Sequence, residues 1–199
     1  MSDRAVGLSR PGRHRDVRNV GFAVSGLADC RRILDRTKLK QITKSGSDMR
    51  FAISNLRERP EFFSTVANRI WAFSWKAKGI SLEQVSAGLR ELISNETFPF
   101  AVVAHDGEHY VGSALGIASD MDERCQYTPW VAAVWVEPHY RGQDAGRSLV
   151  SYAAENLLQE FQRIYLCAVS ARHDFYARQG WVPIERDVGE KRLTVFIKE

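Results

Sequence analysis

Residues 136–150, VEPHYRGQDAGRSLV, combine the features of an anion-binding turn. They join the apolar run Trp130–Val136 to a segment with the period of an amphipathic helix. Gly142 and Gly146 let the main chain approach a bulky group, because glycine has no Cβ and accepts positive φ. The first N–H groups of a helix lack intrahelical partners and lie at the positive end of its dipole. This junction therefore predicts a site for an anion, above all a phosphate.

Two arginines add positive charge to the same turn, and two familiar phosphate-binding patterns do not fit it. Arg141 precedes the first glycine and Arg147 follows the second. The turn lacks the G-x-G-x-x-G spacing of a dinucleotide fold, and Gly142–Ser148 is one residue short of a Walker loop, with Arg in place of its Lys. These differences disfavour nucleotide hydrolysis. The alternative is a solvent-exposed turn that binds no ligand.

Apolar periodicity predicts the elements that hold this turn in place. The expected strands are 50–54, 99–105, 109–118, 130–136, 164–169, 181–185 and 192–197, and the expected helices are 60–79, 81–95, 145–160 and 173–179. Phe73 belongs to the apolar positions of the first helix, and Ser81 and Gln84 form a capping box at the start of the second.

The order of these elements predicts an α/β (α+β) fold. The residues Asp106-Gly107-Glu108 between two strands indicate a tight hairpin, which requires antiparallel pairing. The strand–helix–strand unit from Trp130 to Val169 requires a right-handed crossover and parallel pairing. We therefore expect a mixed, mostly antiparallel sheet of about seven strands, flanked by about four helices.

Length and composition indicate an ordinary globular protein. The chain has 199 residues, of which 44% are hydrophobic, enough for one or two domains. No apolar run reaches the roughly 18 residues of a membrane helix, and the N-terminal residues lack the apolar stretch of a secretory signal. Three widely spaced cysteines argue against a disulfide scaffold or a structural zinc site. We therefore expect a cytoplasmic protein without membrane association and without a metal.

The positive charge lies mainly in the N-terminal quarter of the chain. Residues 1–48 hold 11 basic and 5 acidic side chains, a net charge of +6, whereas residues 49–199 hold 17 and 19, a net charge of −2. A solvated basic extension is a commoner use of such a segment than nucleic-acid binding, which we do not expect. We expect residues 1–48 to be weakly ordered or to form one short helix, and Met49 is a candidate natural start of the compact domain 49–199.

The turn and the strand before it resemble the signature of the GNAT superfamily of acyl-CoA-dependent N-acetyltransferases. That signature is Q/R-x-x-G-x-G/A after a strand ending in V-x-P, and here Arg141-Gly142-Gln143-Asp144-Ala145-Gly146 follows Val136-Glu137-Pro138. The resemblance covers the order of elements from residue 49 to the C-terminus. It implies that the parallel strands splay into a V-shaped gap, with acetyl-CoA on one side and an amine acceptor on the other.

The resemblance also implies acetyl-CoA as the co-substrate. The residues then expected to hold it are Val134, Trp135, Val136, Arg141, Gly142, Gln143, Asp144, Ala145, Gly146, Arg147 and Ser148. The strand backbone would pair with the pantetheine arm, and the amides of the turn would hold the pyrophosphate. Asp144 departs from the family pattern, which has glycine there. Aspartate tolerates a left-handed φ better than most residues and is able to cap the following helix, so we expect Asp144 to point away from the phosphates.

One tyrosine resembles the family's proton donor. Tyr176 lies in the segment Asp174–Trp181, which is similar to the family's F/L-Y-x-x-x-G-F/W. In that segment the tyrosine commonly acts as general acid towards the departing thiolate. The alternative is a tyrosine that only packs in the core. The family often has an Asn on the preceding loop, where Val169 and Ser170 stand here.

The general base stays open from the sequence alone, because neither strand of the parallel pair carries Glu or His. The candidates, besides a water chain, are Glu137, Asp120, Asp122, Glu123 and His173. Asp122, Glu123 and Trp130 are also the expected acceptor-binding residues, since acids attract cationic amines and aromatic faces favour them. A solvated loop beside core tryptophans would explain the same residues.

These features predict an N-acetyltransferase that moves the acetyl group of acetyl-CoA to a primary amine by direct attack, with Tyr176 as general acid. The alternative is a catalytically inactive acyl-CoA-binding regulatory module. The acceptor is either a small, antibiotic-like amine or a protein N-terminus or lysine. A homodimer is left open.

Overall fold

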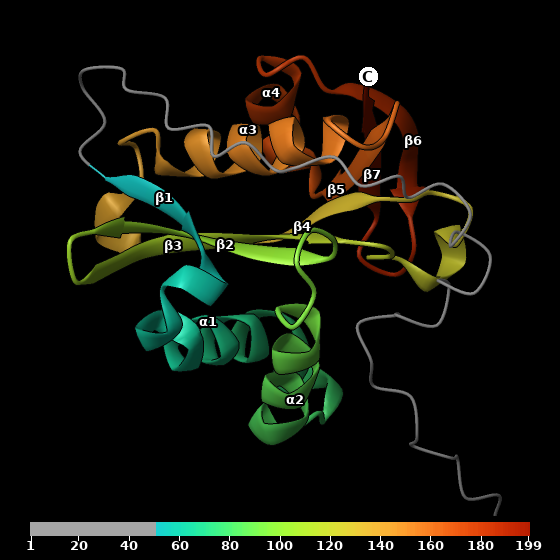
Figure 1. Cartoon of the computed structure of the whole chain (residues 1–199). Coiled ribbons are helices and arrows are strands. Elements are labelled where there is room, and N and C mark those ends of the chain that lie inside the picture. Colours follow the sequence, from blue (N-terminus) through green and yellow to red (C-terminus); the bar gives the residue numbers. More distant parts are fainter. Residues whose placement is uncertain (1–50) are drawn as a thin grey trace, which may run out of the picture.

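The computed structural model describes residues 51–199, so the expectations for residues 1–48, Met49 and Arg50 lie outside the described residues. The strands are β1 (Ala52–Asn55), β2 (Phe100–Asp106), β3 (His109–Ile117), β4 (Trp130–Val136), β5 (Ile164–Ala168), β6 (Val182–Val188) and β7 (Leu193–Lys198). The α-helices are α1 (Phe63–Ile70), α2 (Leu82–Leu92), α3 (Ala145–Leu158) and α4 (His173–Ala177). The predicted elements are present in the predicted order, with shifted boundaries (Figure 1).

The strands form one mixed sheet in the order β1-β2-β3-β4-β5-β7-β6. Every neighbouring pair is antiparallel except β4 and β5. Within residues 51–199, these two parallel strands are in register only at Trp130 and Tyr165, near the amino end of both strands. Beyond this point the strands diverge. The prediction of a mixed sheet with one splayed parallel pair is therefore confirmed.

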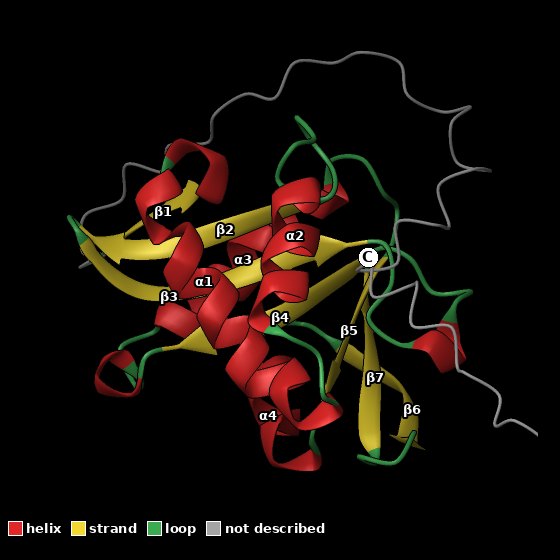
Figure 2. Cartoon of the chain, turned by 90° about the horizontal axis from the view of Figure 1, so that it is seen from below, coloured by secondary structure: helices red, strands yellow, loops and turns green. Residues whose placement is uncertain are grey.

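Helices cover both faces of the sheet. α3 and α4 lie on one face, and α1 and α2 lie on the other (Figure 1). The side chains of β2 alternate between these layers: Val102 and Ala104 pack with α3, whereas Ala101 and Val103 pack with α1 and α2. Figure 2 shows α1 and α2 over the β1–β4 half of the sheet, while β5, β7 and β6 continue to one side. None of the helices in this described part is long and apolar enough to cross a membrane.

Local sequence signals form two of the elements as predicted. At the start of α2, the Ser81 side chain accepts a hydrogen bond from the Gln84 amide (3.2 Å), and the Gln84 side chain accepts one from the Ser81 amide (2.9 Å). Between β2 and β3, Gly107 has φ of +59°, which suits glycine in a tight turn. The capping box and the hairpin are therefore confirmed.

The segment predicted as one helix from residue 60 to Gly79 is divided instead. α1 is followed by a π-helical turn, Trp71–Trp75, and by a short 3-10 turn that ends at Gly79. The wider π-helical turn changes which side chains share a face with the α-helix before it. Phe73, predicted in the buried stripe, is 60% exposed as a result. The single-helix prediction is wrong at this point.

Candidate active site

The divergence of β4 and β5 creates a gap around which the candidate site is built. At its closed end, Tyr165 donates its amide hydrogen to the Pro129 carbonyl (2.9 Å). On the other side of β4, the pairing with β3 is interrupted by a bulge, in which Ala133 has φ of +49°. A bulge bends its strand and leaves an extra residue unpaired. β4 therefore offers main-chain groups to a ligand along the gap.

The predicted anion-binding turn lies directly beyond the open end of β4. Gly142 has φ of +79°, and Asp144 has φ of +61° at the N-cap of α3. The first hydrogen bond of the helix runs from the Ser148 amide to the Asp144 carbonyl (2.9 Å), so the amides of residues 145–147 precede it. These amides stand at the positive end of a helix of 14 residues. The turn thus has the backbone geometry of an anion site.

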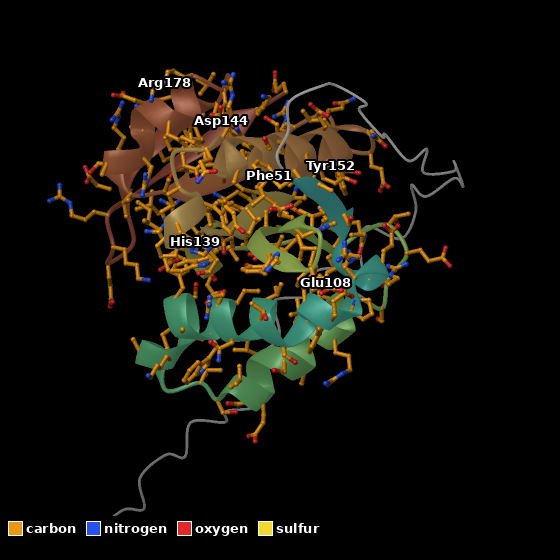
Figure 3. The ribbon with its side chains drawn as sticks, turned by 90° about the vertical axis from the view of Figure 1, so that its left-hand side faces the viewer. Phe51, Glu108, His139, Asp144, Tyr152 and Arg178 are labelled. Carbon is orange, nitrogen blue, oxygen red and sulfur yellow. The ribbon has the colours of Figure 1, made fainter. Side chains whose placement is uncertain are left out.

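Asp144 meets one part of its prediction and not the other. Its left-handed φ agrees with the expectation, and its side chain is exposed. However, that side chain makes no capping hydrogen bond to α3, so the predicted side-chain cap is wrong. A residue at an N-cap usually has extended backbone, which aims its side chain at the first amides of the helix; left-handed backbone does not. Figure 3 labels Asp144 together with His139, which precedes the same turn.

Side chains of the turn are tied back to the end of β4. Arg141 donates from Nε to the Val136 carbonyl (3.0 Å), and its guanidinium lies over the Trp135 ring, 5.2 Å from the centroid. Gln143 donates from Nε2 to the His139 carbonyl (2.9 Å). The charge of Arg141 is therefore held beside the strand end rather than over the amides of α3. Val136 and Val134 pack towards α3 on the other face.

Tyr176 lies on α4 with its ring in the core. It is 9% exposed and contacts the rings of Phe175 and Phe196, with centroids 5.0 and 5.7 Å away. Burial raises the pKa of the Tyr176 hydroxyl to about 12; nearby Cys167 adds to the rise, and the charge of Arg172 opposes it. The phenol therefore keeps its proton at neutral pH.

Asp120 and Cys167 meet on the α1/α2 side of the gap. The Cys167 thiol of β5 donates to Oδ2 of Asp120, which follows β3, at 3.3 Å. Protein surrounding the carboxyl raises the pKa of Asp120 to about 6, while the Cys167 hydrogen bond and the charge of Lys78 lower it in part. The Asp120 residue as a whole is nevertheless exposed. Burial and the Asp120 charge raise the pKa of Cys167 as well.

A family model identifies this arrangement. Residues 97–183, which include β2 to β5, the anion-binding turn and Tyr176, match the model described as Acetyltransferase (GNAT) domain. The matched segment, residues 97–183, is a GNAT acetyltransferase domain. Proteins of this family use an acyl-CoA as donor and an amine as acceptor.

Solved structures share the fold of this GNAT domain at low sequence identity. An acetyltransferase from Streptococcus agalactiae 2603 has 20% identity and a TM-score of 0.56, covering 76% of this chain and 99% of its own. ElaA from Escherichia coli has 14% identity and a TM-score of 0.55, covering 75% and 99%. An aminoglycoside 6′-N-acetyltransferase complexed with coenzyme A has 16% identity and a TM-score of 0.55, covering 74% and 96%. No sequence among curated proteins matches the chain.

Two other candidates for the general base, Glu137 and His173, each contact an arginine. Glu137 accepts from Nε of Arg69 (2.5 Å) and from the indole N–H of Trp135 (3.4 Å). The ring of His173 contacts Arg186 (Nε2 to Nη2, 3.3 Å). Within residues 51–199, no group of three or more His, Cys, Asp or Glu side chains is arranged to hold a metal ion.

The residues expected to bind the acceptor differ in their exposure to solvent. Asp122 and Glu123 are exposed on a 3-10 turn between β3 and β4. Trp130 is fully buried at the closed end of the gap, and its indole N–H donates to the Tyr127 carbonyl (2.6 Å). A direct contact between Trp130 and an acceptor is therefore not supported. Trp130 is instead a residue of the hydrophobic core.

Sequence reasoning overlooked three features of the site. The bulge at Ala133 had no signal beyond two adjacent small residues, Ala132 and Ala133, in an apolar strand. Cys167 is the one thiol-bearing position in β5, but its contact with Asp120 joins residues 47 positions apart. Phe73 lies against Trp135, with ring centroids 5.7 Å apart. Such contacts depend on how the sheet and α1 pack, which a local pattern does not record.

Proposed function

We propose that this GNAT domain moves the acetyl group of acetyl-CoA to a primary amine by direct attack of the amine on the thioester carbon. The single observation that carries the proposal is the gap: β4 and β5 pair at one position only and open towards the amino end of α3. A pantetheine arm needs an unpaired strand edge, and a pyrophosphate needs exposed amides. Both lie at the same end of the gap.

Acetyl-CoA fits the residues at this place. Main-chain groups of Val134, Trp135 and Val136 are available to the pantetheine arm once Arg141 releases the Val136 carbonyl. The amides of residues 142–147 suit the pyrophosphate, because they combine helix-end N–H groups with a left-handed turn. Released from Trp135, the Arg141 guanidinium can pair with a phosphate.

Asp120 is our proposed general base. As the amine nitrogen bonds to the thioester carbon it becomes acidic, and a carboxylate with a pKa of about 6 is ionised at neutral pH and able to take the proton. Of the candidates, Asp120 faces the gap through Cys167, whereas Glu137 is paired with Arg69. The C–S bond then breaks, and its electron pair leaves on sulfur.

Tyr176 is our proposed donor to that sulfur. Its pKa of about 12 exceeds the value of about 8.5 for a simple thiol, so the phenol stabilises the departing sulfur by a hydrogen bond better than by complete proton transfer. Asp120, once protonated, is a stronger acid than the thiol, because its pKa is about 6. It supplies the proton that converts the departing thiolate into the thiol of coenzyme A. The products are the N-acetylated amine and free coenzyme A.

Release of free thiol from acetyl-CoA in the presence of a panel of primary amines tests the proposal. Turnover with at least one amine, slowed about tenfold or more by Tyr176→Phe with unchanged coenzyme A affinity, is expected. Coenzyme A binding without thiol release for any amine would favour the alternative, an inactive acyl-CoA-binding module. Unchanged turnover in Tyr176→Phe would remove the role assigned to Tyr176.

Two further observations concern the acceptor and the cellular compartment. The aminoglycoside 6′-N-acetyltransferase with a similar fold has only 16% identity, so it does not select the acceptor here. We place the activity in the cytoplasm, because the described cysteines Cys125 and Cys167 are free thiols, as a reducing compartment favours.

A further inference from the structure

Large apolar side chains are exposed at few positions of the described chain, and two of them border the gap. They are Phe73 (60% exposed), Val169 (48%), Val182 (57%) and Ile184 (41%). Phe73 contacts Trp135 of β4, and Val169 directly follows β5. Each side of the gap therefore carries an exposed apolar residue near its open end. The other two lie on β6, which is separated from β5 by β7.

The exposure of Phe73 is built into its segment. The indole N–H of Trp71 donates to the Ile80 carbonyl (2.8 Å), and the Ile80 amide donates to the Trp75 carbonyl (3.3 Å), so the π-helical turn is closed at both ends. Lys78 lies over the Trp75 ring, 4.8 Å from its centroid. These contacts hold Phe73 outward.

Phe73 and Trp135 form a rigid apolar surface on the α1/α2 side. Their rings are tilted by 56°, with centroids 5.7 Å apart. The Trp135 indole N–H points to Glu137, which is itself fixed by Arg69. An aromatic pair held in this way binds another flat apolar group at little cost in side-chain entropy.

We propose that Phe73 and Trp135 are the acceptor-binding surface, and that the acceptor is a small primary amine that carries an aromatic or similarly flat apolar group. This inference rests on the proposed acetyl transfer and names its substrate class. Exposed apolar rings offer no hydrogen-bond partners to the hydroxyl groups of a sugar-like amine, so such acceptors gain little here.

The distance between the surface and the reacting groups sets the length of the acceptor. Trp135 is two residues beyond the bulge at Ala133, or about 7 Å along the strand. Asp120 and Cys167 lie on the same side of the sheet. The charge of Lys78, on the turn that follows Phe73, lowers the pKa of Asp120 in part. We therefore choose a short acceptor, with its amine nitrogen two or three bonds from its ring, for the test.

Steady-state kinetics with phenethylamine and ethanolamine test the inference on the full chain. These amines share the two-carbon spacing and differ in the apolar ring. We expect kcat/KM at least about tenfold higher for phenethylamine, since a buried ring contributes that much or more. Phe73→Ser should reduce this ratio to near one, and Phe73→Leu should give an intermediate ratio. Val182→Ser, which removes an equally exposed side chain from β6, should leave the ratio unchanged.

Several outcomes overturn the inference while leaving the acetyl transfer intact. They are equal kcat/KM for both amines with the unmodified chain, equal ratios in Phe73→Ser and Val182→Ser, or a clear preference for a peptide amine over phenethylamine. Comparing the melting temperatures of the variants with that of the unmodified chain shows whether a variant has lost only the apolar surface or has failed to fold. Thiol release with no amine at all, despite coenzyme A binding, would instead overturn the proposed function on which the inference rests.

Discussion

At the scale of single residues, the site depends on two groups whose pKa values are raised by burial. Asp120 has a pKa of about 6 and remains ionised at neutral pH, so it can accept a proton. Tyr176 has a pKa of about 12 and remains protonated, so it can donate a hydrogen bond. The same physical cause thus suits Asp120 to its proposed role as base and Tyr176 to its proposed role as donor.

Replacing Asp120 by Asn should lower kcat by about a hundredfold or more, because general base catalysis contributes about that much. Coenzyme A affinity should not change. In the unmodified chain, kcat/KM should rise with pH through about 6 as the carboxyl ionises. A pH profile with the same rise in Asp120→Asn would assign the base to another group.

The same variant should change stability in a pH-dependent direction. The folded chain holds the Asp120 proton more tightly than the unfolded chain, because the folded pKa is about 6 and the ordinary value is 3.8. Ionisation therefore disfavours the folded state above pH 6, and this effect fades as the pH falls towards 3.8. Asp120→Asn should raise the melting temperature more at pH 8 than at pH 5.

Asp144 is expected to weaken the binding of coenzyme A. Asp144 is the N-cap residue of α3, beside the amides proposed to hold the pyrophosphate, and exposed charges at helix ends change free energies by about 0.3–1 kcal/mol. Asp144→Asn, which keeps a residue tolerant of left-handed φ, should therefore tighten the Kd by about twofold to fivefold. Asp144→Gly tests the backbone as well as the charge. Equal affinity in all three proteins at low salt would show that the carboxylate lies away from the ligand.

At the scale of elements, the position of β4 depends on a glycine in β3. A Cβ at Gly112 would stand 2.4 Å from the Trp135 carbonyl oxygen and 3.0 Å from Leu149 Cδ1. The first of these atoms is backbone, so it cannot rotate away. Gly112→Ala should therefore displace β4 beside its bulge.

We expect Gly112→Ala to lower the unfolding free energy by about 1–3 kcal/mol, the usual cost of overpacking. Gly146→Ala is the matched control, because its Cβ would meet Val136 Cγ2 at 3.5 Å, an ordinary contact, and helices favour Ala. Chemical denaturation measures both. Equal stability of the two variants would mean that β4 adapts without strain.

The elements themselves could largely be predicted from sequence. Strand 130–136 was predicted with its observed limits, because its apolar run ends at Pro138. The capping box at Ser81 and the hairpin at Gly107 are local signals, and local contacts form them. The π-helical turn was not predictable, because its apolar spacing reads equally well as a continuous α-helix.

The candidate site was predictable where it consists of one continuous segment. The backbone geometry of the turn at residues 136–148 could be predicted, because glycine and aspartate are residue types that accept positive φ. The contact of Cys167 with Asp120, and that of Phe73 with Trp135, join distant parts of the chain and were not foreseen. Arg141 was expected beside the phosphates, yet its side chain contacts the Val136 carbonyl and the Trp135 ring.

At the scale of the whole molecule, the sheet separates the two proposed substrates. The anion-binding turn leads into α3 on one face (Figure 1), and Asp120 contacts Cys167, which packs against the core on the α1/α2 side. Both substrates can therefore be bound together, and attack needs no covalent enzyme intermediate. Cys167 is a poor candidate for such an intermediate, because burial raises the pKa of its thiol and keeps it protonated.

Initial rates at varied concentrations of acetyl-CoA and amine should give intersecting double-reciprocal lines, as a ternary complex requires. Parallel lines would instead indicate an acetylated enzyme. Cys167→Ala should keep the intersecting pattern.

The most direct test of the account is calorimetric titration of coenzyme A into the full chain. Because the gap and the anion-binding turn are proposed to bind this molecule before any chemistry, we predict saturable heat with one site per chain. That heat should be larger than for pantetheine alone, which lacks the pyrophosphate. A well-folded protein that shows no saturable heat, or that binds pantetheine and coenzyme A equally, would contradict the proposed site.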